Sequence, residues 1–391
     1  MSDDRIVIVG AGIFGVTAAV ELRRRGAAVM LVDPGPLPHP DASSTDISKA
    51  VRMDYGDDAF YAELGERAIH GWHAWNRHWE SPLYHEDGFL LMTREPMLPG
   101  EFEAEGFRLL TERGVPVERV DRAMLELRFP AWNGANYADG YFNPRAGWAE
   151  SRRVVARLVE EARLAGVELR EGRRFAGWVE ERGSIVGATL EGGEVLPGDR
   201  ILLAAGAWTP ALLPELADRI WVTGQPVLHF RPSEPEPFRA ERFPVWSADI
   251  SRTGWYGFPL SADGIVKVAN HGPGRRLAAD APRAVAPAIE QRCREMLRET
   301  IPALAAAPLV ATRECLYCDS WDGDFWIDRH PHRPGLVVAA GGSGHAFKFA
   351  PVLGAIIADV VEGGPGPDRF AWRERGDRRT EQARGGDPAD A

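Results

Sequence analysis

Three glycines and one aspartate near the N-terminus have the spacing of a phosphate-binding turn. Gly10, Gly12 and Gly15 form a Gly-x-Gly-x-x-Gly pattern, and Asp33 follows it. In such a turn the first glycine permits a tight bend, the second lets a pyrophosphate approach the backbone, and the third lets a helix pack closely on a strand. The acid accepts hydrogen bonds from a ribose, and the N-terminus of the helix favours phosphate charge. These residues predict a dinucleotide site, for which this stretch alone leaves NAD and FAD open.

The elements around this pattern support the interpretation. The apolar, β-branched run at 6–9 predicts a buried parallel strand. Ala18 and Leu22 have helical spacing, and residues 28–32 predict a second strand that ends at Asp33. A glycine pattern is informative when it lies between a strand and a helix in this way. The alternative is a glycine turn in an unrelated α/β unit.

Lysine is rare in this chain. Of the 46 basic residues, only Lys49, Lys267 and Lys348 are lysine, and all the others are arginine. A lysine ammonium is a compact charge whose pKa shifts with its surroundings, whereas a guanidinium is broad and stays charged. The three lysines are therefore candidates for chemistry that arginine cannot perform. The alternative is that these three lysines lie at the surface by chance and have no special function.

Two of these lysines lie in segments whose local structure is predictable. Residues 264–271 predict a strand with Lys267 and His271 on one face, which is either an exposed sheet surface or the wall of a polar cavity. The serine-rich residues before Ile47 are good N-caps and predict a short helix, in which Lys49 and Arg52 would share one face.

A second glycine loop carries the third lysine. The apolar run at 335–340 predicts a buried strand, and the segment GGSGHAFKFAP at 341–351 leads from it into an apolar helix. The start of this helix is again suited to stabilising negative charge. Another buried strand ends in Ala-Gly-Ala-Trp at 205–208, which suggests a second close approach of backbone to the same cofactor.

The cysteines do not predict a metal site or a disulfide framework. Cys293, Cys315 and Cys318 are too few for such a framework. A zinc site formed by Cys315, Cys318, His330 and His332 is disfavoured, because the His-x-His spacing is too tight for the common finger pattern. A strand at this point would also send the two nearby cysteines to opposite faces, and a thioredoxin-like pair belongs at a helix N-terminus.

Length and charge exclude several classes of protein. The chain has 391 residues and a net charge of −11, which disfavours a nucleic-acid partner. It contains no apolar run of about 18 residues, so we expect no membrane span. The first predicted strand begins too early to leave room for a signal peptide, so we expect a cytoplasmic enzyme.

The chain resembles the flavin-dependent amine oxidases typified by monomeric sarcosine oxidase, N-methyltryptophan oxidase and pipecolate oxidase, to which the amadoriases (fructosyl-amino-acid oxidases) are related. The resemblance covers nearly the whole chain and is specific for the family rather than for a substrate. It is carried by GAGIFG at 10–15, residues 43–55, AGAW at 205–208, Lys267 with His271, CLY at 315–317, DFWIDRHP at 324–331 and GGSGHAFKFAP at 341–351.

The resemblance implies an α/β fold (α+β, two domains) in which a Rossmann-like FAD-binding domain is combined with a discontinuous substrate domain that contains a mixed β-sheet. We expect a monomer or a small homo-oligomer. The expected segments are 1–80, 140–220 and 330–365 for the FAD-binding domain, 81–139 and 221–329 for the substrate domain, and 366–391 for a flexible tail.

The resemblance also implies how the cofactor is held. Cys315 matches the cysteine that forms a thioether to the flavin 8α-methyl group, so the FAD would be covalent. The loop at 342–348 would place a helix N-terminus near flavin N1 and the C2 carbonyl. The expected cofactor-binding residues are Gly10, Gly12, Ile13, Phe14, Gly15, Asp33, Ser43, Ser44, Lys49, Gly206, Trp208, Cys315, Gly342, Gly344, His345, Phe347 and Lys348.

Further roles follow from the resemblance for catalysis and substrate binding. Lys267 matches the lysine that assists O₂ reduction, and Tyr317 and His271 match residues that line the substrate cavity. These three are the candidate catalytic residues. Arg52 and Lys348 match the pair that binds the substrate carboxylate, and Lys49 is a third candidate in substrate binding.

The implied reaction is the oxidation of a secondary amine or N-substituted amino acid by hydride transfer from carbon to flavin N5. The imine hydrolyses, and O₂ reoxidises the flavin to give hydrogen peroxide. Lys49 stands where sarcosine oxidases carry arginine and amadoriases carry lysine, which argues against sarcosine. The alternatives are an amadoriase, or a biosynthetic flavin oxidase or dehydrogenase that acts on a cyclic amine or imine.

Overall fold

A computed structural model describes residues 4–376 and residue 384, and the chain divides into two compact units. The first unit comprises the described residues up to Lys49, Glu150–Val222 and the described residues from Leu316 to 376. The second comprises Ala50–Ala149 and Thr223–Cys315. The expected boundary at residue 80 lies instead at 49/50, because helix α2 (Ala59–His78) packs on strand β4 (Tyr84–His85) of the second unit.

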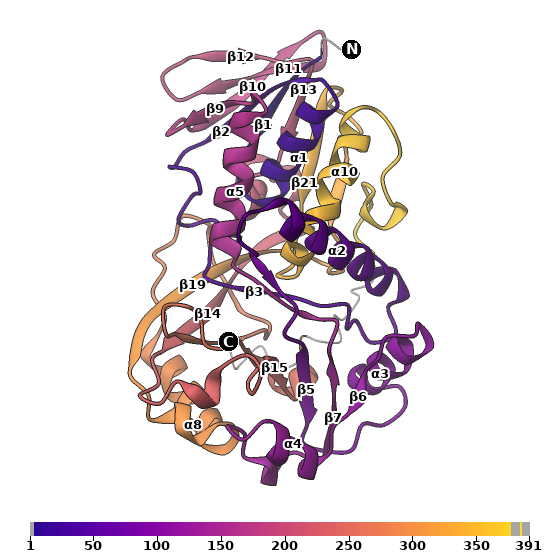
Figure 1. Ribbon diagram of the computed structural model, residues 1–391. Helices are drawn as coiled ribbons and strands as arrows, with labels where there is room; N and C mark the ends of the chain where they lie inside the picture. The colour runs from indigo at the N-terminus through magenta and orange to yellow at the C-terminus, as the bar shows by residue number, and fades with distance from the viewer. Residues whose placement is uncertain (1–3, 377–383, 385–391) are drawn as a thin grey trace. The chain divides into compact units, whose positions relative to one another are not determined.

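The first unit is built on a six-stranded sheet (Figure 1). Its strands in spatial order are β20 (Trp326–Arg329), β21 (Leu336–Ala340), β13 (Arg200–Leu203), β1 (Arg5–Val9), β2 (Ala28–Asp33) and β9 (Glu168–Glu171). Every neighbouring pair is parallel except β20–β21. The strand order reverses at β1, and sheets of this type bind ligands beyond the carboxyl end of the strand at such a point.

Both faces of this sheet are covered. Figure 1 shows α1 (Ile13–Arg24) between α5 (Ser151–Leu164) and α10 (Ala350–Val361) on one face. The other face carries a three-stranded sheet of β10 (Phe175–Glu181), β11 (Ser184–Leu190) and β12 (Val195–Pro197), against which Val7 and Val9 of β1 pack. The short α6 (Thr209–Leu212) follows β13. The predicted strand, glycine turn, helix and second strand are therefore confirmed.

The second unit is built on a nine-stranded sheet. The path in space is β18 (Arg275–Arg276), β14 (Ile220–Phe230), β17 (Val266–Asn270), β16 (Trp255–Gly257), β15 (Val245–Ala248), β5 (Phe89–Thr93), β7 (Asp139–Asn143) and β6 (Glu118–Arg119), and β19 (Leu309–Ser320) pairs with β14. Strands β15 and β5 are parallel, whereas the pairs that flank them are antiparallel. The expected mixed sheet, and with it the expected fold class, is confirmed.

Helices complete the core of the second unit. Leu228 of β14 and Val268 of β17 pack in one apolar cluster with Leu297 of α8, and Trp72 of α2 is fully buried. Besides α2, the helices are α3 (Phe102–Glu112), α4 (Arg122–Arg128), α7 (Ile250–Thr253), α8 (Pro287–Thr300) and α9 (Pro302–Ala305).

The helix predicted over residues 47–52 is wrong. Lys49–Val51 form strand β3, which pairs with β8 (Gly147–Ala149) in a small sheet that also contains β4. Lys49 and Arg52 therefore do not share a helical face. Pairing with a partner strand outweighs the capping signal of the preceding serines, because strand formation depends on cross-strand neighbours more than on local sequence.

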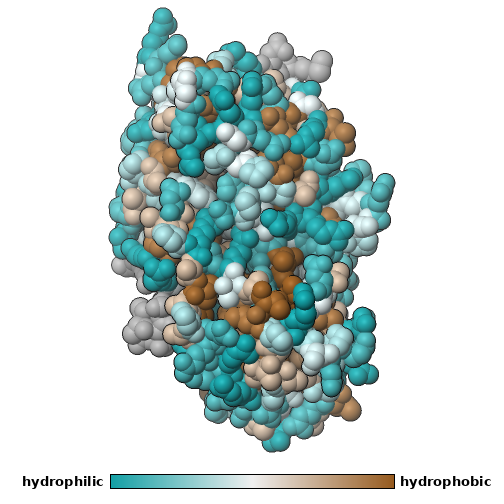
Figure 2. Space-filling view, turned by 90° about the vertical axis from the view of Figure 1, so that its left-hand side faces the viewer, coloured by the Kyte–Doolittle hydropathy of each residue, from teal (hydrophilic) through white to brown (hydrophobic). Residues whose placement is uncertain are grey.

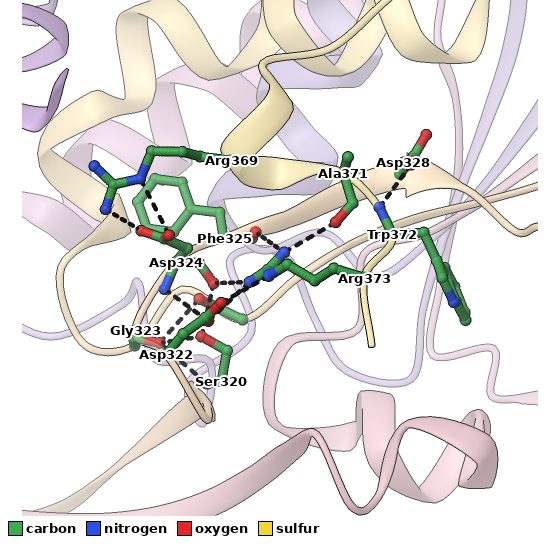
Figure 3. Close-up of polar contacts among 12 residues, drawn as sticks. Ser320, Asp322, Gly323, Asp324, Phe325, Asp328, Arg369, Ala371, Trp372 and Arg373 are labelled. Atoms are coloured by element: carbon green, nitrogen blue, oxygen red, sulfur yellow. Dashed lines mark hydrogen bonds and ion pairs between the residues drawn. The ribbon is translucent and has the colours of Figure 1, made fainter. Parts of the chain in front are cut away.

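Residues 366–376 also differ from the expected flexible tail. The 3₁₀ helix η6 (Asp368–Phe370) and the residues after it pack on the turn between β19 and β20 (Figure 3). Phe370 is fully buried, with its ring centroid 5.0 Å from that of Phe325. Except for residue 384, the remainder of the expected tail lies outside the described residues.

Two arginines hold this segment in place, as Figure 3 shows. Arg373 donates two hydrogen bonds to the Asp322 carboxylate, from Nε at 2.7 Å and from Nη2 at 2.8 Å. Its guanidinium lies 4.7 Å from the centroid of the Trp326 ring. Arg369 makes a second forked pair with Asp324. Forked pairs of this kind are specific in geometry as well as favourable in energy.

Polar residues predominate on the molecular face drawn in Figure 2. Across residues 4–376, none of the helices combines the length and the apolar character needed to cross a bilayer.

The Arg373–Asp322 pair yields a stability prediction. Arg373→Gln leaves a largely buried carboxylate without its partner, so we expect the free energy of unfolding to fall by about 2–3 kcal/mol, measured by urea denaturation. The matched control is Arg239→Gln, which removes an ion pair to Glu236 whose two side chains are exposed. No measurable loss is expected for the control. Equal stabilities of the two variants would contradict the role given to Arg373.

Candidate functional site

The first glycine turn has the geometry that its spacing predicts. Gly10 has φ of 105°, and a Cβ there would lie 2.5 Å from the carbonyl oxygen of Ala204. A Cβ on Gly15 would lie 1.8 Å from the carbonyl oxygen of Gly10, so this glycine lets α1 approach the end of β1. A Cβ on Gly12 would touch only Ser44 Oγ, at 3.7 Å, which leaves open space beside that backbone.

Asp33 is held beside this turn by backbone hydrogen bonds. Its Oδ2 accepts a hydrogen bond from the Ala11 N–H at 2.9 Å, and its Oδ1 accepts one from the Gly35 N–H at 3.1 Å. Burial raises the pKa of the Asp33 carboxyl, and the two N–H groups act in the opposite direction. Each oxygen keeps a further lone pair, so the carboxylate can still accept from a hydroxyl group.

The residues around the turn fit a bound pyrophosphate. Among the residues that the structure describes, no side chain caps the N-terminus of α1, and its first turn contains no acid. Ser44 Oγ is buried and has no hydrogen-bond partner within that part of the chain. Unpaired N–H groups at a helix start and an unsatisfied buried hydroxyl are both groups that phosphate oxygens would satisfy.

Three more predicted residues lie in the first unit. Gly206 begins the 3₁₀ helix η2 (Gly206–Trp208) directly after β13, with φ of 53° and no atom within 4 Å of a would-be Cβ. Ser43 Oγ donates a short hydrogen bond to the carbonyl oxygen of Leu316. Trp208 packs near the His39 ring, with centroids 6.1 Å apart.

The second glycine loop adjoins the first. A Cβ on Gly342 would lie 3.3 Å from the Phe14 ring, so the two loops meet at this side chain. Gly344 has φ of 73°, and a Cβ there would lie 2.2 Å from the Tyr317 ring. His345 Nε2 donates to the Gly323 carbonyl at 3.0 Å, which ties the loop to the turn that the C-terminal arginines hold.

Lys348 is buried in the 3₁₀ helix η5 (Ala346–Phe349), which precedes α10. Its Nζ donates to the carbonyl oxygen of His345 at 3.2 Å and lies 5.6 Å from the centroid of the Phe349 ring. A buried ammonium is costly unless polar groups or negative charge surround it. Phe347 of the same helix is buried as well.

In the second unit, Lys267 lies on a buried sheet face. Its side chain is 1% exposed, and Nζ is 4.3 Å from the centroid of the Phe258 ring. Ala269 of the same face packs with Cys315, whereas Val268 packs in the main core on the opposite face. The prediction that alternate β17 side chains share a face is confirmed. His271 is also buried, so the alternative of an exposed sheet surface is wrong.

Arg52 is the anion-binding candidate of the second unit. Its guanidinium carbon lies 5.3 Å from the Tyr55 ring centroid and 5.5 Å from that of Phe89. Arg52 Nη1 is buried and has no hydrogen-bond partner among the described residues. Asp54 nearby is fully buried; burial raises the pKa of its carboxyl, and the charge of Arg52 lowers it.

The candidate residues are thus divided between the units. Those in the first unit are Gly10, Gly12, Ile13, Phe14, Gly15, Asp33, Ser43, Ser44, Lys49, Gly206, Trp208, Tyr317, Gly342, Gly344, His345, Phe347 and Lys348, and those in the second are Arg52, Lys267, His271 and Cys315.

Cys315 and Cys318 pack in different apolar clusters, as expected for opposite strand faces. Burial raises the pKa of the Cys318 and Cys293 thiols to about 12.

Two contacts of the candidate residues were not predicted from the sequence. The ring of Phe258 lies against Lys267, and Asp54 is the buried counter-charge near Arg52. The Phe258 contact depends on pairing between β16 and β17, which has no local signal. The sequence shows that Arg52 and Asp54 are two residues apart, but this spacing alone does not show that Asp54 is buried near the guanidinium.

A largely parallel sheet with a glycine turn at its switch point, in a chain that also forms a mixed-sheet unit, is the architecture of a dinucleotide-binding protein. The chain belongs to the FAD dependent oxidoreductase (DAO) family, whose model matches residues 5–360. FAD is accordingly the dinucleotide that this family uses, which resolves the choice that the N-terminal turn left open.

The similar proteins agree with the resemblance found in the sequence. N-methyl-L-tryptophan oxidase of Salmonella heidelberg is 28% identical over 362 residues, 92% of this chain and 94% of the relative. Monomeric sarcosine oxidase of Streptomyces avermitilis is 29% identical over 364 residues, 91% and 93% of the two chains. The structure of the fructosamine oxidase Amadoriase II of Aspergillus fumigatus matches with a TM-score of 0.85 at 25% identity, covering 99% of this chain and 94% of that one.

The contact between Gly15 and Gly10 yields a prediction for cofactor binding. In Gly15→Ala the new methyl group would meet a backbone oxygen, so α1 must move away from the phosphate-binding turn. We expect the FAD content of the purified protein to fall at least about tenfold, as a loss of roughly 1.4 kcal/mol or more would produce. Absorbance at the flavin band relative to protein measures this content.

The matched control is Gly177→Ala, where no atom lies within 4 Å of the added Cβ. This variant should keep its FAD. If Gly15→Ala retains FAD as well as the control does, the close approach of α1 is not required for cofactor binding.

Proposed function

We propose that this protein is an FAD-dependent oxidase of a secondary amine that carries a carboxylate, such as an N-substituted amino acid. FAD, when bound, would supply two-electron chemistry: a hydride from a carbon bonded to the amine nitrogen would reduce it, and O₂ would reoxidise it to give hydrogen peroxide. The oxidised substrate leaves as an imine, which water hydrolyses to a carbonyl compound and an amine.

The observation that carries this proposal is the buried, unsatisfied Nη1 of Arg52. A guanidinium between two aromatic rings has lost water without gaining a protein partner for this group. A carboxylate is the natural partner, because it accepts two parallel N–H bonds from a guanidinium. We assign Arg52 and Lys348 to the substrate carboxylate, with Lys49, Tyr317 and His271 as further contacts of the substrate.

Lys267 is assigned to the reaction with O₂. Its ammonium group is buried on the sheet face and lies against the Phe258 ring. A fixed positive charge in a site with little water stabilises negative charge that develops on oxygen, and it needs no reorganisation to do so. Arginine would spread the same charge over a larger plane.

Cys315 is assigned to a covalent thioether with the flavin 8α-methyl group. This thiol is buried on the same sheet face as Ala269, two residues along β17 from Lys267. Covalent attachment would raise the flavin potential and prevent its loss. We further propose a cytoplasmic enzyme, monomeric or a small homo-oligomer.

Oxidation of a fructosyl amino acid is a second candidate function. It is favoured by Lys49, which matches the lysine of amadoriases, and by the likeness to Amadoriase II. In this protein Lys49 Nζ lies 3.9 Å from the Asp46 carboxylate. A charged pair of this kind can bind the hydroxyl groups of a sugar. A biosynthetic oxidase or dehydrogenase that acts on a cyclic amine or imine is the remaining alternative.

A peroxide-release screen tests the proposed function. The panel contains sarcosine, N-methyltryptophan, other N-methyl amino acids, fructosyl-valine and cyclic imino acids, each with its carboxamide as the matched control. We expect peroxide from an N-substituted amino acid, and a kcat/KM at least about 100-fold lower for its amide, because the amide leaves the guanidinium unpaired. Peroxide from fructosyl-valine alone would select the second candidate, and equal rates with acid and amide would refute the role of Arg52.

The covalent link has its own test. Cys315→Ala should bind FAD that is released into the supernatant by acid precipitation, whereas the flavin of the unchanged protein stays in the pellet. Cys318→Ala is the matched control, because this thiol is also buried but lies on the other face of β19, so the flavin of this variant should remain bound. Flavin that stays in the pellet with Cys315→Ala would contradict the assignment.

A further inference from the structure

A histidine lies directly across the sheet from Lys267. Strands β14 and β17 are antiparallel, and their register pairs His229 with Lys267. The Cβ atoms of directly opposite residues in such a pair are about 4.5–5.5 Å apart, and both side chains leave the sheet on the same face. His229 is 7% exposed and Lys267 is 1% exposed, so both residues are buried.

Lys267 is therefore flanked on both sides. The Phe258 ring lies 4.3 Å from Nζ on the β16 side, and His229 is the neighbour on the β14 side. Phenylalanine has no ionisable group, whereas an imidazole has one. A histidine changes its charge between about pH 5 and 8.

The other ionisable groups on this face of the sheet can be named. Tyr256 of β16 packs against the cluster that contains Cys315. His271 follows the last residue of β17 and lies four residues along the chain from Lys267. Arg313 of β19 shares the face of Cys315, two residues away, by strand alternation. Of these groups, only His271 is a second histidine, so a test must separate it from His229.

We propose that His229 is a positioning residue for the reaction with O₂, and that its protonation sets the pH dependence of flavin reoxidation. This inference rests on the proposed role of Lys267. Two electrons from reduced FAD and two protons convert O₂ to H₂O₂, and the first electron gives O₂ a negative charge. A protonated His229 adds a positive charge next to Lys267, which favours that negative charge, and a neutral His229 does not.

A positive charge on His229 and the ammonium group of Lys267 would repel each other, so protonation of one group disfavours protonation of the other. The direction of the effect nevertheless follows from charge alone. Protonation of His229 adds one positive charge beside Lys267, and loss of that proton removes it. Reoxidation should therefore slow as the pH rises, by roughly tenfold for the loss of one charge in a partly screened site.

Stopped-flow mixing of the anaerobically reduced holoenzyme with O₂ tests this inference. The bimolecular rate constant for reoxidation is measured from pH 5.5 to 8.5. With the unchanged protein we expect a fall of roughly tenfold across one titration. In His229→Gln the rate constant should stay at the lower level throughout, while the pH dependence of flavin reduction by substrate is unchanged. His229→Asn serves in its place if the glutamine variant does not fold.

Two further variants separate the possible outcomes. His229→Lys carries a permanent charge, so it should keep fast reoxidation at pH 8. His271→Gln should still show the titration, because that imidazole is not the one opposite Lys267. A fall with pH that persists in His229→Gln, or that vanishes in His271→Gln, would overturn the inference.

Lys267→Met tells whether the proposed function itself fails. This variant should slow reoxidation by at least about 100-fold, in line with the loss of one fixed charge or donor at a developing anion. If it does so while His229→Gln keeps the full pH dependence, only the role of His229 is refuted. If the flavin of Lys267→Met is reoxidised at the normal rate, the roles proposed for Lys267 and for His229 are both refuted.

Discussion

Close packing between the first glycine turn and α1 is the constraint on which the cofactor unit depends. Gly15 brings the helix backbone against the Gly10 carbonyl at a distance that no side chain tolerates. This contact points the start of α1 at the space beside Gly12, and Asp33 is fixed there by the N–H groups of Ala11 and Gly35. The orphaned N–H groups and the positive end of the helix dipole then face one place, so the phosphate site follows from the packing.

The second unit buries positively charged side chains away from solvent. Lys267 is almost completely buried, and the Phe258 ring compensates for only part of its lost hydration. Arg52 has a buried N–H group that no described residue satisfies. Buried charged groups of this kind are typical of functional sites, where a ligand or a reacting molecule compensates for the hydration that the group has lost. Both residues lie in the second unit.

The C-terminal arginines extend this support to the second glycine loop. Arg373 and Arg369 hold the turn at 322–324, and His345 of the loop donates to the Gly323 carbonyl in that turn. Residues that look like a solvated tail in composition are thus part of the framework around Gly344. Charge and glycine content describe a segment by itself, whereas its order depends on whether acidic partners lie opposite, as Asp322 and Asp324 do here (Figure 3).

The sequence by itself determined the features that depend on neighbours along the chain. These are the glycine turn with its flanking strands and helix, the alternation that puts Lys267 and Ala269 on one face, and the family to which the chain belongs. Only the tertiary structure decided that residues 49–51 are a strand, that α2 belongs to the second unit, and that His229 lies opposite Lys267. Each of these features depends on pairing between residues far apart in the chain. Local propensity carries no information about such pairing, because the free energy comes from the partner strand or helix.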